Sequence, residues 1–172
     1  MGEIKSTLDL VFEKTKNLTL SDEEKLSLAR ENLDKKVQAL CNRYLDNFLA
    51  LSRLKDEMQK IASNDREQAY HFFQEYLLSR FDLDGDNSLI VSALSEIVSF
   101  DMTFLKELHK KYNSEKEGTK KVLTEKSLLS LKERGVSGSA VGVNLDTIPE
   151  WNEFLKTLRK RYQEQIQTKE SA

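Results

Sequence analysis

The sequence predicts an all-α fold, an elongated helical bundle built around one long helix hairpin, with a helix of about 40 residues. Apolar residues recur at helical spacing along most of the 172-residue chain. The single proline is Pro149, so residues 1–148 lack the strongest helix breaker. Charged residues make up 33% of the chain, which is typical of amphipathic helices with much exposed surface. We expect residues 1–172 to form a single helical domain.

The first two helices are predicted at about residues 3–17 and 21–62. An apolar stripe marks the first helix at Ile4, Leu8, Val11, Thr15 and the neighbouring Phe12. Ser21 and Glu24 form a capping box at the start of the second helix. Apolar residues then continue at three- and four-residue steps to Ile61, which predicts a helix of roughly 60 Å. Such a helix needs a partner along its length.

The middle of the chain is predicted to hold three further helices. Asn64 can cap the first, which carries the densest aromatic stretch of the sequence, up to Phe81. After a loop at residues 82–88, a second helix should run to Gly118, with a kink or a second cap at Asp101. A third helix should begin near residue 119 or 124 and stop at Gly135.

An uncharged, glycine-containing loop is predicted at residues 135–146, ahead of the last helix. Its alternation of apolar and small residues over 141–145 also suits a short extended stretch. Thr147 and Glu150 then fit a capping box, and Pro149 suits the first turn of the last helix. The tail after about residue 167 is expected to fray.

Composition argues against several classes of function. The net charge of −2 comes from 27 basic and 29 acidic residues, so no field of one sign favours nucleic acid or an anionic membrane. Cys41 is the only cysteine, which excludes an internal disulfide and a cysteine-rich zinc site. No apolar run approaches the ~18 residues of a membrane span, and the first residues lack the apolar core of a signal peptide. The expected compartment is the cytoplasm.

The acidic loop at residues 82–88 resembles the start of a calcium-binding loop. Asp82, Asp84 and Asp86 occupy alternate positions, from which carboxylates can converge on one hard cation. The pattern then fails, because Asn87 stands where glycine is needed and Ala93 where a bidentate glutamate is needed. These three aspartates are candidates for weak cation binding, with a plain solvated turn as the favoured alternative.

Other sequence features carry weaker signals. The glycines at 135, 138 and 142 lack the ending of a phosphate-binding loop, and the two histidines lack the spacing of a zinc site. A basic cluster lies on the last helix at Lys156, Arg159, Lys160 and Arg161. Nearby glutamates dilute its charge, so it is interpreted as a solvated helix face rather than a site for nucleic acid or an acidic partner. No cofactor is expected.

The function predicted first is a non-enzymatic helical scaffold that binds another protein or itself, with a homodimer as the preferred state. The candidate interaction residues are an anchor on the last helix and the uncharged loop, namely Trp151, Phe154, Val141, Val143 and Asn144. The alternative is a ligand-binding protein or enzyme with its site at residues 135–144. A protein that responds to cations through the acidic loop is a third possibility.

Two stretches of the chain resemble small uncharacterised bacterial helical proteins. They read GEIKSTLDLVFEKT near the start and GVSGSAVGVNLDTIPEW late in the chain. The resemblance covers these two stretches only, and it implies no activity, cofactor or site residue.

Overall fold

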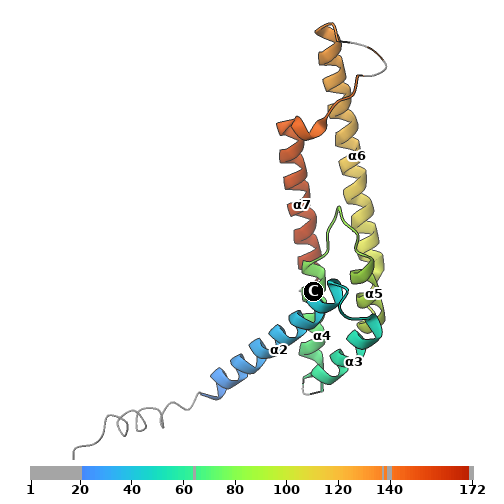
Figure 1. The fold of residues 1–172 in the computed structure, drawn as a ribbon. Helices are drawn as coiled ribbons and strands as arrows, with labels where there is room; N and C mark the ends of the chain where they lie inside the picture. Colours follow the sequence, from blue (N-terminus) through green and yellow to red (C-terminus); the bar gives the residue numbers. More distant parts are fainter. Residues whose placement is uncertain (1–20, 64, 137, 139–140, 171–172) are drawn as a thin grey trace, which may run out of the picture.

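The structure is a computed structural model, and it describes residues 21–170 except 64, 137, 139 and 140. Every regular element among these residues is helical, which confirms the all-α prediction (Figure 1). The elements are α2 (Asp22–Leu45), α3 (Leu51–Ile61), α4 (Arg66–Ser79), α5 (Ser88–Ile97), α6 (Met102–Glu133), the 3₁₀ helix η1 (Leu145–Thr147) and α7 (Pro149–Glu170). The helix predicted at residues 3–17 lies outside the described residues.

The predicted helix of about 40 residues is wrong, because the chain turns between α2 and α3. The Ser21–Glu24 capping box is confirmed at the start of α2. At the other end Asn47 adopts a left-handed conformation with φ of 61°. The Asn47 N–H donates to the Tyr44 carbonyl (3.0 Å) and the Phe48 N–H to the Arg43 carbonyl (2.8 Å). These two bonds form a Schellman motif, which ends α2 and lets α3 fold back beside it.

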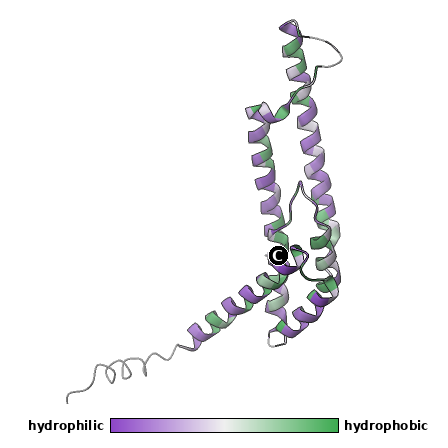
Figure 2. Ribbon diagram, in the orientation of Figure 1, coloured by the Kyte–Doolittle hydropathy of each residue, from purple (hydrophilic) through white to green (hydrophobic). Residues whose placement is uncertain are grey.

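The main core lies where α2, α3, α4 and α5 meet. The buried stripe of α2 faces the aromatic side of α4, and α3 and α5 close the cluster. Its members include Val37, Leu40, Cys41, Tyr44, Leu54, Met58, Phe72, Phe73, Leu77 and Leu94. The Tyr44 hydroxyl donates to the Leu89 carbonyl (3.0 Å), which joins α2 to α5. Figure 2 shows hydrophobic residues gathered at this end of the molecule.

The helix α6 is the longest in the described chain, with 32 residues, and it passes through the predicted stop at Gly118. It begins after a break at Ser99, whose φ is 51°, and Asp101 caps it by accepting from the Thr103 N–H (2.9 Å). The second cap predicted at Asp101 is therefore confirmed. Helix α6 ends at a Schellman motif with Gly135 at φ of 79°, as the sequence predicts for its last turn.

The last two helices form a hairpin that rises from the core (Figure 1). Helix α7 begins at Pro149, as predicted. Thr147 instead lies in η1, and its hydroxyl donates to the Asn144 carbonyl (2.8 Å). Helix α4 is capped by Asp65, which accepts from the Gln68 N–H (3.1 Å), one residue after the predicted cap. Among the described helices, none carries an apolar stretch of membrane-spanning length.

Candidate functional site

The acidic loop between α4 and α5 rises between α6 and α7 (Figure 1). Its Asp84 side chain contacts both helices. The Asp84 carboxylate accepts from Lys116 Nζ (2.5 Å) and the Tyr112 hydroxyl (2.8 Å) of α6. It also accepts from Arg159 Nε (2.7 Å) of α7. We call this set of four residues the Asp84 clasp. It joins three segments that are far apart in the sequence.

The other two aspartates of the loop stabilise the loop itself. Asp82 accepts from the Asp84 N–H (2.9 Å), and Asp86 accepts from the N–H (2.9 Å) and hydroxyl (3.1 Å) of Ser88. Asn87 closes the turn, accepting from the Asp82 N–H (2.8 Å). Over the described residues, no three histidine, cysteine, aspartate or glutamate side chains are grouped as a metal site requires. The geometry therefore gives the predicted cation site no support.

Charge compensation keeps Asp84 ionised within the clasp. Its side chain is only 21% exposed, and this desolvation favours the neutral form. The hydrogen bonds from Lys116, Tyr112 and Arg159 outweigh the desolvation and lower the pKa of Asp84 from 3.8 to about 2. Burial and the neighbouring Asp84 carboxylate together raise the pKa of Tyr112 to about 12. The clasp is thus a set of satisfied charges that holds α6 and α7 in place.

A second polar group lies beside the clasp. Glu115 accepts from the Tyr162 hydroxyl (2.6 Å) and pairs with Arg161. The Tyr162 ring packs edge-on against Tyr112, with 5.5 Å between ring centroids. Three of the four cations in the predicted basic cluster form ion pairs within the chain: Arg159 with Asp84, Arg161 with Glu115 and Lys160 with Glu164. All three side chains remain exposed, which agrees with the interpretation of the cluster as a solvated face.

The candidate interaction residues of the last helix are packed within the chain. Trp151 is 4% exposed and stacks with Phe154 at 5.8 Å between ring centroids. Both lie in the hairpin that α7 makes with α6. Trp151 is therefore covered by its own chain and is not exposed as an anchor for a partner.

The uncharged loop borders a groove at the far end of the hairpin. A hollow of about 720 Å³ is lined by residues of α6, including Leu123 and Leu131, and by Val143 and Asn144. The Asn144 side chain accepts from the Asp146 N–H (3.1 Å) and so caps η1. Val141 is half-buried. The described residues 141–144 form no strand. The ligand site predicted here remains a prediction.

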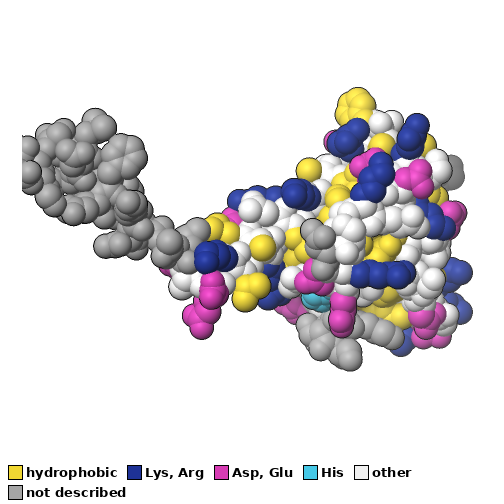
Figure 3. All heavy atoms as spheres, turned by 90° about the horizontal axis from the view of Figure 1, so that it is seen from below, with side chains coloured by type: hydrophobic (Ala, Val, Ile, Leu, Met, Phe, Trp, Pro, Cys, Tyr) yellow, Lys and Arg dark blue, Asp and Glu magenta, His cyan; other side chains and the backbone are white. Residues whose placement is uncertain are grey.

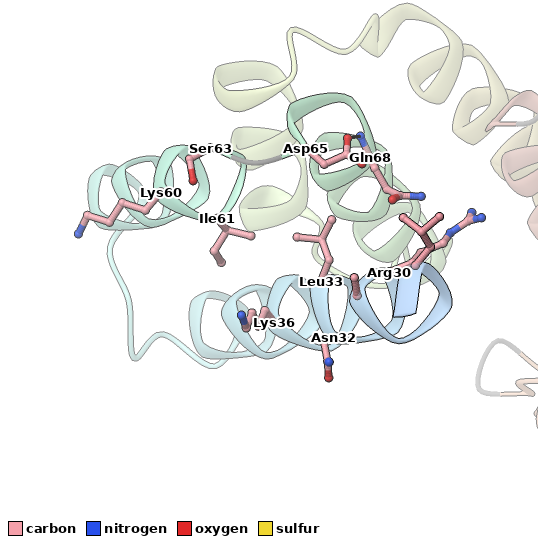
Figure 4. Close-up of a pocket in the computed structure, with 11 residues that line it drawn as sticks. Arg30, Asn32, Leu33, Lys36, Lys60, Ile61, Ser63, Asp65 and Gln68 are labelled. Carbon is pink, nitrogen blue, oxygen red and sulfur yellow. Dashed lines mark hydrogen bonds between the residues drawn. The ribbon is translucent and has the colours of Figure 1, made fainter. Parts of the chain in front are cut away.

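A second groove lies between the first half of α2 and the α3–α4 turn. It has a volume of about 590 Å³. Its apolar lining comes from Leu26, Ala29 and Leu33 of α2 and from Ile61 of α3. In Figure 4, Leu33 and Ile61 point into the space between the helices. We call this feature the α2 groove.

The apolar stripe of α2 extends past the core and into the α2 groove. Its later members, from Val37 to Tyr44, are buried in the core, and Leu33 is half-buried. Leu26 on the same stripe is 72% exposed. Figure 1 shows this first half of α2 projecting from the body, and Figure 3 shows hydrophobic side chains exposed along it. The stripe thus has about two helical turns of apolar surface that the described chain leaves uncovered.

Polar contacts hold the base of this projecting segment to α4. The Arg30 guanidinium lies over the Phe72 ring, 5.6 Å from its centroid. The side-chain nitrogen of Gln68 donates to Asp65 Oδ2 (3.2 Å), and its side-chain oxygen accepts from Arg30 Nε (2.9 Å). These contacts fix the direction in which residues 22–29 leave the body, so the α2 groove is formed before any partner binds.

The rim of the α2 groove is mainly basic. Arg30, Lys36 and Lys60 line it, against one carboxylate, Asp65. Lys60 pairs with Glu57 (2.7 Å) on the outer side of α3. Among the described side chains, Lys36 has no ion pair within 4.0 Å. An apolar floor with a basic rim suits an amphipathic helix that carries acidic residues beside its apolar stripe.

Sequence reasoning missed both the Asp84 clasp and the α2 groove. Nothing in the local pattern joins Asp84 to Arg159, because the contact depends on how α7 returns along α6. The α2 groove exists only because α2 ends at Asn47, and the continuing apolar spacing concealed that end. The available signal was the pair Asp46–Asn47, since asparagine tolerates the left-handed conformation of a helix end.

Comparisons with known proteins found no relative of this chain. No family model, no curated protein and no solved structure matches the chain. The resemblance to small bacterial helical proteins therefore remains an expectation from two short stretches.

Proposed function

We propose that this chain is a non-enzymatic helical scaffold that binds an amphipathic helix in the α2 groove. The observation that carries the proposal is the exposed continuation of the α2 stripe, with Leu26 uncovered and Leu33 directed into the groove. Covering a leucine of this kind contributes roughly 1.5–3 kcal/mol, so the uncovered stripe favours binding of a second apolar face.

The partner helix is defined by the chemistry of the groove. Leucines or similar residues at three- and four-residue steps would fill the apolar floor. Glutamates or aspartates beside that stripe would face Arg30, Lys36 and Lys60. Because these rim charges are exposed, they set the orientation and association rate of the partner more than its affinity.

A designed peptide tests this proposal directly. The probe is a fluorescein-labelled helical peptide with leucines at three- and four-residue spacing and glutamates on both flanks. We expect its fluorescence anisotropy to rise saturably on titration with the full chain. A matching peptide with lysines in place of the glutamates should bind at least several-fold more weakly, because like charges would meet at the rim.

Two surface variants locate the binding. Leu26→Lys places a charge on the exposed stripe and should weaken binding of the peptide by 10-fold or more. Leu129→Lys makes the same change at another exposed leucine, 63% exposed on α6, and should leave binding unchanged. Equal binding by wild type and Leu26→Lys would contradict the proposal. So would a monomeric wild-type chain that does not bind the peptide.

A further inference from the structure

We propose that the helix bound in the α2 groove is the α2 of a second copy of this chain, running antiparallel to the first. This inference rests on the proposed function, and it names the partner. The resulting assembly is a homodimer with a two-fold axis near Ala29. Each copy supplies both a groove and the helix that fills the other groove.

The apolar stripe of α2 can pack against the same stripe of a second α2 that runs antiparallel to it. Leu26, Ala29 and Leu33 lie on one face at steps of three and four residues. In a two-fold contact the same patch occurs on both sides. With the axis at Ala29, Leu26 of one copy lies near Leu33 of the other, and the two alanines meet at the centre. A small residue at that centre allows the helices to approach closely.

The charges of α2 favour the antiparallel direction. Its first turn carries Asp22, Glu23 and Glu24, all exposed. About four turns later lie Lys35 and Lys36, and Lys36 is on the rim of the α2 groove. An antiparallel pair with its axis at Ala29 places Asp22 of each copy against Lys36 of the other, twice over by symmetry. A parallel pair would instead set the two acidic turns against each other.

The size of the contact predicts a reversible dimer. The free part of α2, residues 22–33, is about 18 Å long at 1.5 Å per residue. A contact made mainly by such a segment from each copy is at the small end of specific interfaces. We therefore expect dissociation on dilution, with a Kd on the order of micromolar.

Charge reversal tests the pairing in the full chain. Sedimentation velocity should show a concentration-dependent dimer for wild type. Asp22→Lys and Lys36→Glu should each weaken it about 10-fold or more, because each sets like charges together. The double variant Asp22→Lys/Lys36→Glu restores opposite charges across the axis and should recover the dimer. Glu125→Lys, an exposed change on α6, is the matched control and should behave as wild type.

A cysteine at the axis tests the register. Under mild oxidation Ala29→Cys should form a covalent dimer, because the two β-carbons meet at the axis. Ser27→Cys points about 200° away around the helix and should stay monomeric under the same conditions. The native Cys41 does not interfere, because it is fully buried and burial raises its thiol pKa to about 12.

The outcomes separate this inference from the proposed function. A wild-type chain that is monomeric at every concentration, yet binds the acidic peptide, would overturn the dimer and leave the proposed function standing. A dimer that survives both single charge reversals, or that links through Ser27→Cys and not Ala29→Cys, would overturn the antiparallel pairing. A monomer that also ignores the peptide would contradict both, and residues 1–20 of the same chain would become the occupant to test.

Discussion

Arg159 Nε lies 2.7 Å from Asp84 Oδ2, which joins the last helix to a loop 75 residues earlier in the chain. Lys116 and Tyr112 hold the same carboxylate from α6. Because both Asp84 carboxylate oxygens already accept hydrogen bonds from these three side chains, Asp84 is not available as a cation ligand. The contact with Arg159 ties α7 to the loop, while buried Leu158, Tyr162 and Ile166 pack the same helix against the core.

Asp84→Asn should destabilise the protein in a pH-dependent way. The folded pKa of about 2 lies below the ordinary value of 3.8, so the charged clasp contributes on the order of 2 kcal/mol above pH 4. That contribution is lost as the pH falls from about 4 to about 2. Urea denaturation of wild type and variant at pH 7, 4 and 2 should show a difference that shrinks steadily. A difference of constant size would show that Asp84 acts by packing and not by charge.

Alanine should change the stability of the protein in opposite directions at Gly118, inside α6, and at Gly135, just after its end. Gly118 lies inside the helix with open space around its missing side chain, so Gly118→Ala should stabilise the protein by about 0.8 kcal/mol. Gly135 has a φ of 79°, so Gly135→Ala should cost about 1 kcal/mol. Thermal melts measure both changes. A loss of stability in Gly118→Ala would mean that α6 is interrupted there after all.

Asn47 should tolerate glycine better than alanine. Its φ of 61° is easy for glycine, and it strains any residue with a β-carbon other than asparagine or aspartate. We expect Asn47→Ala to cost about 1 kcal/mol in free energy of unfolding and Asn47→Gly to cost less. Chemical denaturation followed by circular dichroism measures the order of the two variants. The reverse order would be inconsistent with the helix end described here.

Local capping signals made much of the helix map predictable. The Ser21–Glu24 box, the Asp101 cap and the Gly135 stop all act within one helical turn of their partners, so the sequence alone reveals them. Two predictions of helix ends were wrong because one local signal was given too much weight. The continuing apolar spacing concealed the helix end at Asn47. A single glycine was read as a stop at Gly118, an exposed position through which α6 continues.

The candidate site was less predictable than the fold. The residues that line the α2 groove are ordinary members of an apolar stripe, and only the position of the turn after α2 leaves Leu26 uncovered. Conversely, Trp151 was predicted to anchor a partner protein because tryptophan is frequent at the centre of protein interfaces. The return of α7 along α6 buries it, and no local signal in the sequence reports that contact.

Hydrogen–deuterium exchange of the full chain at rising concentration shows whether a second copy covers the first half of α2. We expect amides in residues 25–33 to exchange more slowly at high concentration, because the second copy protects that half of the helix. Amides around Leu129 should be unaffected, and Leu26→Lys should abolish the concentration dependence in α2. Equal exchange of residues 25–33 at every concentration in wild type would contradict the claim that a second copy covers this face.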